Sequence, residues 1–196
     1  MKVYLEVGSK KVFACSIDWP GWCRSAKDED LALEALDAYA PRYAIVAKRA
    51  GLPFKVGTLD VVERLKGNAT TDFGAPAMIA TADHTPFTAK QAERAAALLD
   101  ASWKVFDDVV QHAPATLRKG PRGGGRDTAK IVEHIADAQD AYARKLGLRK
   151  ATRTDILDAV RSARPAKENG WPARYTVRRI AWHVIDHAWE IEDRAD

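Results

Sequence analysis

From residue 88 onward, the apolar residues recur at the spacing of α-helices, and this pattern constrains the fold more than any other feature. Thr88 with Gln91, and Thr152 with Asp155, form capping boxes that mark two helix starts. Each segment has one apolar face to bury, so we predict four helices that pack as a bundle. Proline and glycine separate the four segments, which are residues 88–112, 127–146, 152–164 and 174–194.

The first part of the chain has a different pattern, with short runs rich in β-branched and aromatic residues. Two runs within residues 2–17 flank Gly8-Ser9 and predict a hairpin. Residues 22–25 indicate a short third strand, and residues 27–50 have helical spacing that Pro41 should interrupt. Residues 54–59 are expected to be a returning strand. The order β-β-(β)-α-β predicts a small α+β unit.

Between these parts, residues 66–87 are rich in Gly, Asn, Thr, Asp and Pro, which is the composition of a domain connection. Phe73 and Phe87 are nevertheless expected to pack against a neighbouring element. The chain is therefore predicted to be an α+β protein in three parts: a domain over residues 1–65, a linker over 66–87 and a four-helix bundle over 88–196.

Composition excludes several function classes. No apolar run approaches the roughly 20 residues needed to span a bilayer, and the first residues lack a signal-peptide core. We therefore expect a cytoplasmic protein with no membrane partner. The net charge is +4, and basic residues are interleaved with acidic ones. Because nucleic-acid binders concentrate positive charge on one face, a nucleic-acid partner is not expected. Cys15 and Cys23 match no C-x-x-C motif, so both are expected to be free thiols.

The densest positive charge lies in residues 118–126, where Gly120 and Gly125 superficially resemble the glycines of a phosphate loop. The segment lacks the Lys-Ser/Thr ending and follows a helix rather than a strand. We interpret it as a basic loop between two helices. Its side chains could meet an anionic ligand at the start of the next helix.

Three histidines in the predicted helices have the arrangement of metal ligands. His183 and His187 are four residues apart, so their side chains lie one above the other on one helix face. His134 lies on the inward face of another helix. Three protein ligands with a vacant fourth position are the pattern of a catalytic zinc site, and bundles commonly hold metals between facing helices. Asp186 and Glu190 are carboxylates that could orient a ligand.

The sequence leaves one alternative open for these histidines. A histidine at the edge of an apolar face is commonly a hydrogen-bonded structural residue rather than a ligand. His84 and His112 fall at the linker and at a helix end, and we expect both at the surface.

The last predicted helix is apolar over more than one face. Trp182, Ile185 and Trp189 widen its apolar arc beyond what one bundle seam requires. Either the N-terminal domain or a second subunit should cover them, and a homodimer is therefore one expectation.

Two motifs in residues 88–196 resemble those of the DinB-like four-helix bundle superfamily. These are His134-Ile135-Ala136-Asp137-Ala138-Gln139 and the segment from Thr176 to His187. The resemblance implies a divalent metal such as Zn or Ni, with His134, His183 and His187 as ligands. It also implies a small-molecule ligand and a thiol transferase or isomerase activity, in which the metal holds a thiolate. The alternative is a non-catalytic binding or scaffold protein with a degenerate site.

This chain departs from the family pattern at one ligand position. The family's last helix often carries H-x-x-x-H-x-x-x-H, in which the second and third histidines bind the metal. Ile191 occupies the third position here. The site is therefore either shifted one turn toward His183 or lost.

The N-terminal unit resembles the HicB fold over residues 1–65. The turn Asp18-Trp19-Pro20-Gly21 and the later Glu34-Ala35-Leu36 carry this likeness. HicB proteins usually append a DNA-binding segment, and none is recognisable after residue 65. The resemblance therefore implies a fold and not an antitoxin role.

Overall fold

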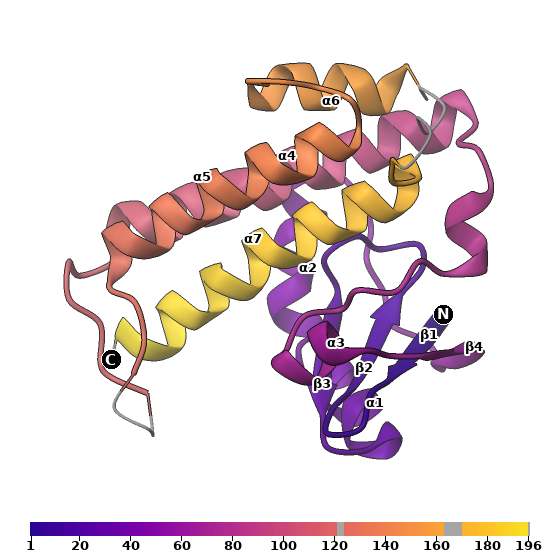
Figure 1. Ribbon diagram of the computed structural model, residues 1–196, viewed down its shortest axis with the longest axis horizontal. Coiled ribbons are helices and arrows are strands. Elements are labelled where there is room, and N and C mark those ends of the chain that lie inside the picture. Colours follow the sequence, from indigo (N-terminus) through magenta and orange to yellow (C-terminus); the bar gives the residue numbers. More distant parts are fainter. Residues whose placement is uncertain (121–123, 163–169, 196) are drawn as a thin grey trace.

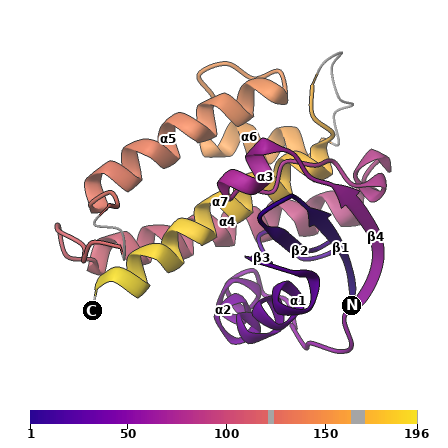
Figure 2. The same ribbon diagram turned by 60° about the horizontal axis from the view of Figure 1, so that its bottom comes forward.

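A computed structural model describes residues 1–120, 124–162 and 170–195. These residues form four strands, seven α-helices and one 3₁₀-helix, which confirms the α+β class. Figures 1 and 2 show the N-terminal sheet at one side of the molecule and the long C-terminal helices at the other, with α7 (Ala173–Ala195) running between α5 (Thr128–Lys145) and the sheet.

The sheet contains four strands in the order β3-β2-β1-β4. β1 and β2 form the predicted antiparallel hairpin, β3 confirms the third strand, and β4 pairs with β1 in parallel. The parallel pairing requires a crossover, which two helices provide. The strands are β1 (Lys2–Val7), β2 (Val12–Ser16), β3 (Cys23–Ala26) and β4 (Asp60–Lys66).

The expectation of a strand over residues 54–59 is wrong, because β4 begins only at Asp60. Phe54 packs instead against the rings of Trp19 and Trp22, with centroid distances of 4.8 and 5.1 Å. Phe54 is therefore apolar because it packs in an aromatic cluster, and not because it belongs to a strand.

One face of the sheet is covered by α1 (Glu29–Ala38) and α2 (Ala40–Arg49). Val3 and Leu5 of β1 point toward this side and are buried with residues of both helices. Pro41 interrupts the predicted helix, as expected, and lies in the first turn of α2. Proline is tolerated there because the first-turn N–H has no intrahelical partner.

The connecting segment covers the opposite face and includes α3 (Ala69–Phe73) and the 3₁₀-helix η1 (Thr81–His84). Glu6 of β1 is fully buried and accepts hydrogen bonds from the backbone N–H groups of Ala77 and Met78, at 2.9 and 3.0 Å. It also accepts one from the Thr71 hydroxyl. This buried carboxylate is thus one of the groups that hold the connection against the sheet, together with Glu63 of β4, which accepts from Thr81.

The expectation that Phe73 packs is wrong, since 89% of its surface is exposed. Thr71 of the same short helix faces Glu6. Residues two apart in a helix lie about 200° around the axis, so Phe73 points away from the sheet. Phe87 packs against the helical core, as expected.

The four predicted C-terminal helices are present. Both capping boxes form, at Thr88 with Gln91 and at Thr152 with Asp155. The apolar faces of the four helices share one buried core. The other helices of this group are α4 (Ala89–His112) and α6 (Arg153–Arg161).

The extra apolar arc of α7 is covered by the N-terminal part of this same chain. Trp182 meets the ring of Phe13 edge-on at a centroid distance of 6.1 Å, and Trp189 meets Tyr39 at 5.0 Å. Of the two alternatives, the N-terminal domain and not a second subunit covers these side chains. The surface that suggested a homodimer is filled within the chain.

The expectation of two free thiols is wrong. Cys15 of β2 and Cys23 of β3 are directly opposite each other, with Cα atoms 4.2 Å apart, and form a disulfide. Strand register brings them together, and their spacing along the sequence does not reveal it. Among the described residues, no helix is both long enough and apolar enough to cross a membrane.

Candidate metal centre

The three predicted histidines converge between α5 and α7. Each offers a ring nitrogen, and these nitrogens all lie within 4.8 Å of one another. The Nε2 atoms of His134 and His183 are 3.1 Å apart. Tetrahedral ligands with zinc–nitrogen bonds of about 2.0 Å are separated by about 3.3 Å, so this pair already has nearly the spacing of two ligands on one ion.

Helix geometry and burial determine how the histidines are placed. Ile131 and Ile135 bury one face of α5 in the helical core, and this orientation turns His134 toward α7. On α7, His183 is 8% exposed, whereas His187 is only partly buried. The cluster therefore has a buried side at His183 and an accessible side at His187.

Glu190 fixes the orientation of His187. Its Oε2 atom is 2.6 Å from Nδ1 of His187, and its Oε1 atom accepts from Nη1 of Arg194, also at 2.6 Å. The hydrogen bond from His187 lowers the pKa of Glu190, so the carboxylate is charged. This contact leaves Nε2 of His187 free, and a carboxylate on the far nitrogen is the usual support of a metal-binding histidine.

Burial keeps the other two histidines neutral. Burial, followed by the neighbouring His187 and His134, lowers the pKa of His183 to about 2. Burial also lowers the pKa of His134. Neutral imidazole is the form that binds a metal, so His134 and His183 can each bind a cation without first losing a proton near neutral pH.

Ile191 lies in the helical core and is 1% exposed. His183, and not the residue at position 191, stands beside His134. Position 191 therefore contributes no side chain to the histidine cluster. His84 and His112 are exposed, as predicted.

Arg24 was missed in the sequence, because it lies on β3, far from the histidines along the chain. Its Nη1 atom donates to Oδ1 of Asp186 at 2.8 Å, and its guanidinium lies 4.0 Å from the centroid of Tyr39. Asp186 is thus held by the N-terminal sheet and, unlike Glu190, is not bonded to a histidine. No local sequence signal could have paired these two residues.

No family model, curated protein or solved structure matches this chain.

An open cavity lies beside Glu190, and none of the three histidines is in its lining. It has a volume of about 320 Å³ and is lined in part by Arg24, Asp186, Glu190 and Arg194. Since Glu190 is bonded to Nδ1 of His187, a molecule in this cavity would lie on the carboxylate side of that ring.

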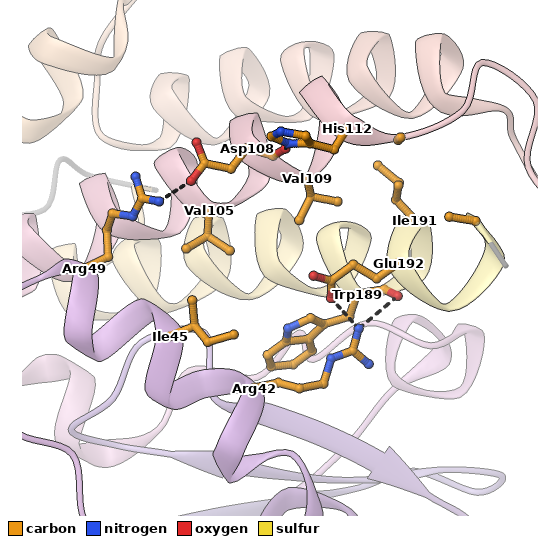
Figure 3. A pocket seen from close by; sticks show the side chains of 12 residues that line it. Arg42, Ile45, Arg49, Val105, Asp108, Val109, His112, Trp189, Ile191 and Glu192 are labelled. Atoms are coloured by element: carbon orange, nitrogen blue, oxygen red, sulfur yellow. Dashed lines mark hydrogen bonds and ion pairs between the residues drawn. The ribbon is translucent and has the colours of Figure 1, made fainter.

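A second open cavity of about 360 Å³ lies between α2, α4 and α7 (Figure 3), and the three histidines are not part of its lining. The ion pairs Arg42–Glu192 and Arg49–Asp108 stand at its edges. Its surface is mostly apolar, with contributions from Ile45, Val105, Val109, Trp189 and Ile191.

The basic loop is only partly described, because residues 121–123, within the segment that resembles a phosphate loop, lie outside the described residues. Its beginning is attached to the end of α7, where Arg118 N–H donates to the carbonyl of Arg194 at 2.9 Å. Nε of Arg194 in turn donates to the carbonyl of Arg118 at 2.8 Å. The loop is thus held near the histidine end of the helices.

Proposed function

We propose that this chain is a divalent-metal-dependent enzyme of the DinB-like type, acting as a thiol transferase or isomerase, with a HicB-like N-terminal module. His134, His183 and His187 would hold Zn or Ni. The observation that supports this most directly is the convergence of three ring nitrogens within 4.8 Å. The resemblance of the two helix motifs supports the choice of family and of reaction class.

The residues around the site fit this proposal. A bound ion would supply Lewis acidity and hold a thiolate or water at its remaining position. His134 and His183 are kept neutral by burial, while Glu190 orients His187. An open cavity of about 320 Å³ is lined by Glu190, the hydrogen-bond partner of His187.

Metal analysis of the full chain, purified without a histidine tag, tests the site. We expect close to one Zn or Ni per chain, and loss of most of it in His134→Ala and His183→Ala. His112→Ala is the matched control, because it removes an exposed histidine of α4 and should keep the metal. A chain that contains no metal, and whose melting temperature does not change with added Zn, Ni or Mn, would refute the proposal.

Activity separates an enzyme from a metal carrier. The zinc-loaded protein should consume a small thiol in the presence of an electrophilic acceptor, and His183→Ala should abolish this. Stoichiometric zinc with no thiol consumption would support a non-catalytic role.

The cavity of Figure 3 favours the alternative, a non-catalytic binding or scaffold protein. Its volume of about 360 Å³ is within the range of small-molecule pockets, which are mostly apolar. Binding of an apolar fluorescent probe that quenches tryptophan emission, blocked by Val109→Phe and unaffected by His134→Ala, would support this alternative.

A further inference from the structure

Arg179 lies on α7 one turn before His183, on the same helix face. Its Cζ atom is 4.7 Å from the ring centroid of Trp182 and 5.4 Å from that of Tyr142. The ring of Tyr142 is also 5.8 Å from that of His183. The same aromatic side chain therefore borders both the guanidinium and the histidine cluster.

One nitrogen of this guanidinium lacks a partner. Nη1 of Arg179 is shielded from solvent and makes no hydrogen bond within residues 1–120, 124–162 and 170–195. A buried donor without an acceptor is destabilising, and more so when it carries charge. The two aromatic rings stabilise the cation, but they do not replace the missing acceptor.

The preceding residue shows the same side chain with its partner present. Arg178 donates from Nε to Oδ1 of Asp83 at 3.0 Å, and from Nη2 to the other carboxylate oxygen. It thus makes the two-point contact for which the guanidinium is shaped. Arg179 can make the same two-point contact, but among the described residues it is bonded to no carboxylate.

We propose that Arg179 binds an anionic group of the substrate, a carboxylate or a phosphate, beside His183. The planar guanidinium fits either anion through two parallel hydrogen bonds. This inference rests on the proposed metal site, because it assigns a substrate class to that site. The proposed function does not include the charge of the substrate, whereas the position of Arg179 indicates a negative charge.

The charges around the cluster agree with an anionic substrate. Of the nearby carboxylates, Glu190 is paired with His187 and Arg194, and Asp186 with Arg24, whereas Asp137, which is close enough to act on His134, forms no ion pair among the described residues. Arg126 is exposed and makes no ion pair within the part of the chain that the structure describes. An excess of positive charge on the two sides of a site attracts anions.

Anion binding to the zinc-loaded full chain, measured by calorimetry with inorganic phosphate and with acetate as separate probes, tests the proposal. Arg179→Gln should weaken binding of the preferred anion about tenfold or more, the loss typical of one charged hydrogen-bonded contact, and leave the zinc content unchanged. The tighter of the two probes identifies the anion.

Arg153→Gln is the matched control. Its guanidinium also faces a tryptophan, at 5.4 Å from the ring centroid of Trp103, but it is bonded to both carboxylate oxygens of Asp107. Anion affinity should be unchanged in this variant. Equal affinity in Arg179→Gln and the unmodified chain would overturn the inference while leaving the metal proposal intact.

Two further arms keep the results separable. If the chain binds no zinc, the titration in the presence of a chelator still decides the inference, because binding that depends on Arg179 supports it and its absence overturns it. If Arg179→Gln does not fold, the Nε–H signal of Arg179 is followed by NMR in the unmodified chain. A phosphate- or acetate-dependent shift supports the proposal, and no shift with either anion overturns it.

Discussion

The two faces of α7 differ in how completely their charged and ionisable groups are paired. On the side of the sheet, Arg178 is paired with Asp83, and the neighbouring side chains are buried in the N-terminal cores, where the uncharged Nε1 of Trp182 has no hydrogen-bond partner among the described residues. On the side of α5, two imidazoles face each other and Arg179 has an unpaired nitrogen. The first face holds the protein together, and the second keeps polar groups available for a ligand, as functional sites commonly do at the expense of stability.

The largest expected effect comes from breaking the buried Arg178–Asp83 ion pair on the sheet side of α7. Asp83→Ala leaves Arg178 buried without its counter-ion, and removing one member of a buried ion pair costs about 3–5 kcal/mol. Urea unfolding followed by circular dichroism should show a loss of this size.

Glu93→Ala is the control, since its pair with Arg161 is exposed and such pairs contribute about 0–1 kcal/mol. Equal effects in the two variants would show that the Arg178–Asp83 pair stabilises no more than a surface contact does.

A smaller effect, on metal affinity, is expected from a change on the side of α7 that faces α5. Glu190→Gln removes the charged acceptor of His187, and loss of such a partner weakens metal binding about 10–100-fold. Zinc affinity measured with a competing chelator should fall by this factor, with little change in unfolding. Glu192→Gln, which affects only a contact to Arg42, should not alter the affinity, and unchanged affinity in Glu190→Gln would contradict the role given to Glu190.

The smallest effect is expected from breaking the Arg24–Asp186 ion pair, which joins β3 to α7. Arg24 and Asp186 form a pair whose side chains are 22% and 36% exposed, so Arg24→Gln should destabilise the protein by less than about 1 kcal/mol. Zinc affinity should remain the same, because Asp186 is not bonded to a histidine. Thermal unfolding and the same chelator titration check both points. A many-fold fall in zinc affinity would mean that the N-terminal sheet helps to form the metal site.

The helices and the histidine cluster could be predicted because both depend on local spacing. Capping boxes and apolar periodicity marked α4 and α6, and the four-residue interval placed His183 beside His187. An inward-facing position on a second helix then brought in His134. The caps and the His183–His187 pair involve residues within a few turns of one another, whereas His134 is 49 residues from His183 and was added because of its inward face on a second helix.

The remaining features depend on contacts between distant segments. Phe54 could have belonged to a strand or to an aromatic cluster, and only its packing on Trp22 decided between them. The bond of Arg24 to Asp186 and the pairing of Cys15 with Cys23 likewise arise from tertiary position and strand register. Hydrophobic pattern alone contains no information about such partners.

The place of α7 has a consequence for the order in which the molecule can fold. Its side chains take part in all three hydrophobic clusters, through Val177 in the helical core, Trp189 beneath the sheet and Trp182 on the opposite face of the sheet. Residues 173–195 are synthesised after every strand and after the six other α-helices that the structure describes. During translation, therefore, neither the sheet nor the earlier helices have a complete core until this segment leaves the ribosome. The chain should then fold in a single cooperative transition rather than one half at a time.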